Sequence, residues 1–83
     1  MTLKEMLKLH EGFRSKVYLD TVGKSTVGYG RNLEDVGVSE DEAELLHDND
    51  IKRATELCRK TFPWFGLIDQ VRQDVIVMMC QVY

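Results

Sequence analysis

A pattern of side chains with the period of an α-helix runs from Ser39 to Phe62. This pattern constrains the fold more than any other feature of the chain. Positions on one face of a helix recur there every three to four residues and are mostly small or apolar: Ala43, Leu46, Asp50/Ile51, Ala54, Leu57/Cys58 and Thr61/Phe62. Ser39 and Glu42 have the spacing of a capping box. Pro63 should end the helix because proline disfavours helical geometry in the residue before it. Such a helix, of about 23 residues, would span about 34 Å, longer than a compact domain of this size requires.

The stretch before this helix predicts a shorter helix and then strands. Thr2 to Glu11 has helical spacing, with Thr2 and Glu5 as a capping box and Gly12 in the C-cap position. His10 lies on the apolar face of this segment and is interpreted as a helix-end residue packed against the core. Residues 15–33 have a different period, with two β-prone runs (17–19 and 25–27), a turn between them and a Gly-Tyr-Gly turn or bulge after them.

The stretch after the long helix predicts two short helices. Residues 64–71 form the first, and residues 75–80 are apolar all round, as in a fully enclosed helix. The predicted fold class is therefore α+β: helix, short antiparallel sheet, long helix and two short helices. We assign residues 1–83 to one small domain, with a helix and β-lobe at 1–36, the long connecting helix at 39–62 and the start of a helical lobe at 64–83.

Composition excludes several classes of protein. No apolar run approaches the ~18 residues that a membrane span needs, and the first residues do not form a signal peptide. Cys58 and Cys80 have no CxxC spacing or neighbouring histidine, so we expect reduced thiols and no metal. Residues 1–32 carry six bases and three acids, whereas residues 33–83 carry five bases and eleven acids. A basic first third suits an anionic polymer, although ordinary scatter in a short segment gives the same asymmetry.

Three polar side chains in the first part of the chain suggest hydrolytic chemistry. Glu11 would end a helix, where the negative end of the helix dipole disfavours an ionised carboxylate and so favours the protonated form that a general acid requires. Asp20 sits in a predicted turn and should stay ionised, and Thr26 could hold a water beside it. Two carboxyl groups in contrasting environments are the arrangement that glycoside hydrolysis uses. Taken singly, each residue is better explained by a structural role, as a helix-end glutamate, a turn aspartate and a strand threonine.

The segment "HEGFRSKVYLDTVGKSTVGYG" resembles the catalytic signature of the phage-type lysozymes, the muramidase and endolysin family that includes the lysozyme of T-even phages. The matching pieces are Glu11-Gly12, Lys16-Val17-Tyr18, Asp20-Thr21-x-Gly23 and Thr26-Val27-Gly28-x-Gly30. The resemblance continues more loosely through "SEDEAELLHDNDIKRA", which is similar to the long helix that joins the two lobes of the family. The chain thus resembles the N-terminal half of such an enzyme.

This resemblance implies a function and a site. The family hydrolyses the β-1,4 bond between N-acetylmuramic acid and N-acetylglucosamine in bacterial peptidoglycan, without a metal or other cofactor, and lyses the host cell. Glu11 would be the general acid, and Asp20 and Thr26 would place the attacking water. The implied substrate-binding residues are Gly30, Arg31, which replaces a histidine common in relatives, and Gln81, which could match a glutamine of the cleft.

The resemblance also sets expectations for partners and location. Members of the family continue into a helical lobe that encloses the segment corresponding to residues 75–82. We expect that apolar segment to be covered, in the first place by a second copy of the chain in a symmetric homodimer, or else by such a lobe or by the chain's own refolded core. We expect synthesis in the host cytoplasm, action on the periplasmic cell wall and no nucleic-acid partner. The alternative function is a non-catalytic module, a truncated or engineered fragment that binds glycan or associates with itself.

Overall fold

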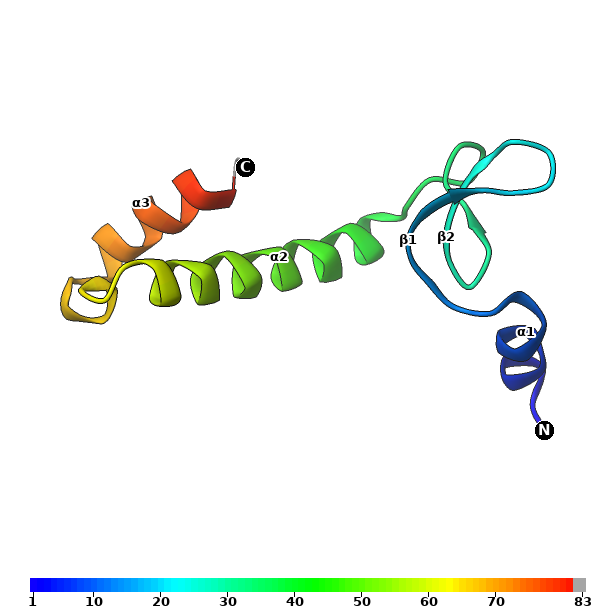
Figure 1. The fold of residues 1–83 in the computed structure, drawn as a ribbon, viewed down its shortest axis with the longest axis horizontal. Helices are drawn as coiled ribbons and strands as arrows, with labels where there is room; N and C mark the ends of the chain where they lie inside the picture. Colours follow the sequence, from blue (N-terminus) through cyan, green and yellow to red (C-terminus); the bar gives the residue numbers. More distant parts are fainter. Residues whose placement is uncertain (82–83) are drawn as a thin grey trace. The chain divides into compact units, whose positions relative to one another are not determined.

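The computed structural model describes residues 1–81, which divide after Ser39 into two compact units (Figure 1). The first unit contains helix α1 (Leu3–Glu11) and strands β1 (Arg14–Leu19), β2 (Ser25–Gly28) and β3 (Arg31–Asn32). The second contains helix α2 (Glu40–Thr61), the short 3-10 helix η1 (Phe65–Leu67) and helix α3 (Gln70–Gln81).

Helix α1 begins and ends where its sequence predicts. The Glu5 backbone N–H donates to Thr2 Oγ1 at 3.1 Å, and the Gly12 N–H donates to the Lys8 carbonyl at 2.9 Å. Gly12 has a φ of 70°, a conformation that glycine adopts without strain. Every residue of α1 is exposed. The interpretation of His10 as a residue packed against the core is therefore wrong, because the His10 side chain is exposed to solvent.

The three strands form an antiparallel sheet in the order β1-β2-β3. Tyr18 pairs with Thr26, which in turn pairs with Asn32, so Thr26 lies on the central strand. The β1 strand begins at Arg14, earlier than its apolar run predicts, and its pairing with β2 is irregular between Arg14 and Tyr18. The side chains of these two residues lie on one another, with the guanidinium 4.8 Å from the ring centroid.

In the second unit, α3 lies beside the C-terminal part of α2 (Figure 1). The region predicted as two short helices is the turn of η1 followed by α3, whose first turn is tied to η1 because Gln73 Nε2 donates to the carbonyls of Phe65 and Ile68, both at 3.1 Å. The buried core is small and consists of Ala54, Cys58, Phe65 and Val77, with Phe62, Ile76 and Cys80 packed against it.

The apolar segment of α3 has only one buried side chain among the described residues, Val77. Val75, Met78 and Met79 are 51%, 68% and 65% exposed. The last residue of the predicted apolar segment, Val82, lies outside the described residues. The chain itself therefore encloses one face of this helix, and the remaining apolar faces are open.

The predicted fold class is confirmed: the chain is α+β, with a helix, a three-stranded antiparallel sheet, a long helix and a further helix. The long helix is observed at Glu40–Thr61, within one residue of the predicted bounds at each end. Within residues 1–81, no helix combines the length and the apolar composition that a membrane crossing requires.

Candidate active site

Glu11 is the last residue of α1, and its carboxylate lies against the backbone of Gly30 in the turn between β2 and β3. A Cβ atom placed on Gly30 would lie 2.9 Å from Glu11 Oε2 and 3.2 Å from its Cδ. Gly30 also has a φ of 82°, which side-chain-bearing residues rarely adopt. The absence of a side chain at residue 30 therefore makes room for the Glu11 carboxyl group.

Two contacts of the Tyr29 ring lie close in sequence to the contact between Glu11 and Gly30. The rings of Phe13 and Tyr29 lie 5.4 Å apart between centroids, and Lys8 Nζ lies 5.1 Å from the Tyr29 centroid. Contacts of these two kinds are each worth about 0.5–1 kcal/mol at an exposed site. They connect the C-terminal end of α1 to the turn that carries Gly30, and so help to fix the position of the Glu11 backbone.

Asp20 occupies the turn between β1 and β2, where its carboxylate caps two backbone donors. Asp20 Oδ1 accepts hydrogen bonds from the N–H groups of Val22 at 2.9 Å and Lys24 at 2.8 Å. The Asp20 backbone N–H also donates to the Lys24 carbonyl at 3.0 Å. The Oδ2 atom takes no part in these two bonds, so the turn is built by one oxygen of the carboxylate.

Thr26 is the only buried polar side chain of the described residues, with an exposed fraction of 2%. Its hydroxyl donates to the Lys24 carbonyl at 2.9 Å. The hydroxyl proton is thus already used in a hydrogen bond. A further partner, such as a water, would have to donate a hydrogen bond to the Thr26 oxygen.

The Lys24 backbone joins Asp20 and Thr26, since its N–H donates to Asp20 and its carbonyl accepts from Thr26. The sequence does not indicate a role for Lys24 in the site. Its contribution comes from main-chain atoms, which are the same whatever the side chain at that position. The Lys24 side chain makes a separate, exposed contact of 3.4 Å with Asp35. An exposed pair of this kind contributes little to stability.

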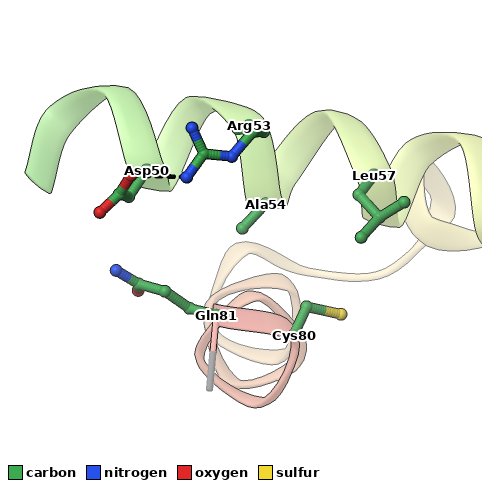
Figure 2. A pocket seen from close by; sticks show the side chains of 6 residues that line it. All are labelled: Asp50, Arg53, Ala54, Leu57, Cys80 and Gln81. Carbon is green, nitrogen blue, oxygen red and sulfur yellow. Dashed lines mark hydrogen bonds and ion pairs between the residues drawn. The ribbon is translucent and has the colours of Figure 1, made fainter. Parts of the chain in front are cut away.

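Arg31 and Gln81, the other two predicted substrate-binding residues, lie in different units. Arg31 pairs with Val27 across β2 and β3, and its Nη1 donates to the Gly37 carbonyl at 3.0 Å. Gln81 lies at the end of α3 and faces a groove between α2 and α3 of about 460 Å³. Figure 2 shows this groove, which is lined by Asp50, Arg53, Ala54, Leu57, Cys80 and Gln81.

The groove holds neither of the candidate catalytic carboxylates. Its own carboxylate, Asp50, is paired with Arg53 at 2.6 Å (Figure 2). Across residues 1–81, no three His, Cys, Asp or Glu side chains gather in a way that could hold a metal ion. The three side chains predicted to be catalytic all lie in the first unit, with Glu11 at Gly30 and with Asp20 and Thr26 at Lys24.

Comparison with models of protein families shows the family to which the chain belongs. The family model described as phage lysozyme matches residues 8–80, a range that includes the whole predicted constellation from Glu11 to Arg31. The chain belongs to the phage lysozyme family. A search of the curated proteins found no match. Membership places the chain among peptidoglycan-lytic glycoside hydrolases, and the resemblance of the chain to the N-terminal region of a phage-type lysozyme is confirmed.

Replacing Gly30 with alanine should lower lytic activity by roughly ten- to a hundredfold, because small displacements of a reacting group cost that much. The new methyl group would meet Glu11 Oε2, the mobile end of a flexible side chain, which can move away at little cost in stability. The carboxyl group would keep its chemistry and lose its position. The rate of lysis and the melting temperature of the variant measure the two effects separately.

Gly37→Ala is the matched control for backbone strain. Gly37 has a φ of 66°, yet nothing lies within 4 Å of a Cβ atom built there. Both alanine variants should therefore lose a similar, small amount of stability, on the order of 1 kcal/mol. Equal lytic activity in the two variants would contradict the role of Gly30 in placing Glu11.

Proposed function

We propose that the chain hydrolyses the β-1,4 bond between N-acetylmuramic acid and N-acetylglucosamine in peptidoglycan, with Glu11 as general acid and Asp20 and Thr26 placing the attacking water. The observation that carries this proposal is the shared attachment of Asp20 and Thr26 to the Lys24 backbone. Family membership supports peptidoglycan as the polymer.

The proposed reaction gives each of the three side chains one role in the bond changes. Glu11, exposed and held at Gly30, donates its proton to the glycosidic oxygen as the bond to the sugar carbon breaks. A water donates one hydrogen bond to the Thr26 oxygen, whose own proton is directed to Lys24, and is oriented by Asp20 Oδ2. Asp20 takes the second water proton as the water oxygen bonds to the sugar carbon.

Loss of turbidity in Gram-negative cells with a permeabilised outer membrane tests this proposal. The chain should clear such cells and release new reducing ends from purified peptidoglycan. A folded chain that binds peptidoglycan without clearing cells or releasing reducing ends would support the alternative function, a non-catalytic glycan-binding module. Because the polymer lies in the periplasm, we further propose that the chain is made in the host cytoplasm and acts after reaching the wall, as part of host lysis.

The open apolar faces of α3 favour an additional role in association. We propose that a second copy of the chain covers Val75, Met78 and Met79 in a symmetric homodimer. Exposing such side chains to water forgoes about 1.5–3 kcal/mol each, and contiguous apolar surfaces of this kind mark interaction sites. A closed pair is the commonest arrangement of identical chains.

Size exclusion with light scattering should give the mass of two chains, and Met78→Lys should shift it to the mass of one. Met78 is 68% exposed, so the substitution should leave the folded unit intact. Lys52→Glu, an exposed change of charge on α2, serves as the control and should leave the mass unchanged. A wild-type monomer that does not bind a dye for apolar surfaces would contradict the homodimer, and capture by an added lysozyme C-terminal lobe would identify that lobe as the occupant.

A further inference from the structure

Cys58 and Cys80 bring two thiols together from different helices of the second unit. They lie 22 positions apart in the sequence, on α2 and α3, and the Cys58 thiol donates to the Cys80 sulfur with 3.1 Å between the sulfur atoms. Both are free cysteines. A disulfide bond is about 2.05 Å long, so the two sulfurs need to approach by about 1 Å to be joined.

The two thiols differ in access to solvent. Cys58 is fully buried in the core with Phe65 and Val77, and burial, together with its hydrogen bond to Cys80 and the charge of that group, raises the pKa of the Cys58 thiol to about 11. Cys80 is only partly buried and lines the groove drawn in Figure 2. It also lines a second groove of about 480 Å³, with Trp64 and Met79. A reagent in solution therefore meets Cys80 first.

We propose that Cys58 and Cys80 are a redox site that closes to an intrachain disulfide on exchange with a disulfide oxidant, RSSR. The Cys80 thiol gives its proton to solvent, and its thiolate attacks one sulfur of the oxidant, forming a mixed disulfide and expelling RS⁻. Cys58 then attacks the Cys80 sulfur and expels the second RS⁻, which takes up the Cys58 proton. The two protein thiols are oxidised to one disulfide, and the oxidant is reduced to two RSH molecules.

Proximity overcomes the low acidity of Cys58 in the second step. A protonated thiol is a poor nucleophile, but Cys58 already contacts the sulfur that it must attack. The closing step should therefore become faster as the pH rises towards the pKa of about 11, because the thiolate fraction of Cys58 increases over that range.

The small core gives the disulfide a physical consequence. Four buried side chains hold α2, η1 and α3 together, and units with so little buried surface are often stabilised by covalent links. The bond would join the two long helices directly and restrict the unfolded chain. Oxidising compartments, such as the bacterial periplasm, are where such bonds form and persist. The site would thus stabilise the helical unit after the chain leaves a reducing compartment.

The test equilibrates the full chain, without denaturant, in buffers of oxidised and reduced glutathione. In the oxidising buffer, the intact mass should fall by two hydrogens, both free thiols should disappear, and a non-reducing gel should show no disulfide-linked dimer. The melting temperature should rise by on the order of 10 °C and return to its starting value on reduction. Persistent free thiols, a stable glutathione adduct beside a free Cys58, or an interchain disulfide would overturn the proposal.

Single variants test the order of attack. After brief oxidation, Cys58→Ser should carry glutathione on Cys80, whereas Cys80→Ser should keep an unmodified Cys58 until it is denatured. Brief alkylation of the reduced wild-type chain, followed by peptide mapping, gives the same comparison without a change to the core, and it should label Cys80 first. Earlier labelling of Cys58 would overturn the proposed order. These measurements do not depend on lytic activity, so their outcome is independent of the proposed function.

Discussion

Replacing Glu11 with glutamine should lower the rate of peptidoglycan lysis by about 10²–10⁴-fold, the typical contribution of general acid catalysis. Glutamine has nearly the shape of glutamate, so it can occupy the same place against Gly30. It cannot give a proton to the glycosidic oxygen. Because Glu11 is exposed at the end of α1, the fold should be unchanged. The decline in turbidity of permeabilised cells and the release of reducing ends measure the effect.

Glu5→Gln provides a matched control on the same helix. Glu5 Oε1 accepts from the Thr2 hydroxyl at 3.0 Å, and the glutamine carbonyl oxygen can accept the same bond. This variant should keep wild-type activity and an unchanged melting temperature. Retention of more than about a tenth of wild-type activity in Glu11→Gln would be inconsistent with a general acid, whose loss costs at least about a hundredfold.

The helices were predictable because their ends depend on a few local residues. Thr2 caps α1 as its spacing with Glu5 indicates, and α2 ends before Pro63 as proline sterics require. The β1–β2 turn likewise follows from local chemistry at Asp20. By contrast, the start of β1 at Arg14 was not predictable, because a polar, exposed strand with an irregular pairing has no apolar alternation.

The contacts that build the candidate site were not predictable from the sequence. Glu11 and Gly30 meet across 19 positions of chain through the space that a missing side chain leaves, and a periodicity argument contains no such distance. The link through Lys24 depends on main-chain atoms, which every residue except proline possesses in the same form. The sequence pattern predicted which residues form the site. The structure adds that Glu11 lies against Gly30 and that Asp20 and Thr26 are both bonded to the Lys24 backbone. Their catalytic roles stay predictions.

Replacing Asp20 with asparagine should lower lytic activity by about 10²–10³-fold, as removal of one preorganised electrostatic group does in other enzymes. The amide oxygen of asparagine can still accept from the N–H groups of Val22 and Lys24, so the turn and its link to Thr26 should persist. The charge that orients and activates the water is lost. Asp20→Ala removes the same charge and also the acceptor of two backbone donors, which should destabilise the hairpin by about 1–3 kcal/mol. Measured side by side, the two variants should share a low lytic rate and differ in melting temperature. If Asp20→Asn lysed cells as fast as the wild-type chain while Asp20→Ala did not, the carboxylate would be needed only to build the turn, and the water would have to be activated by another group.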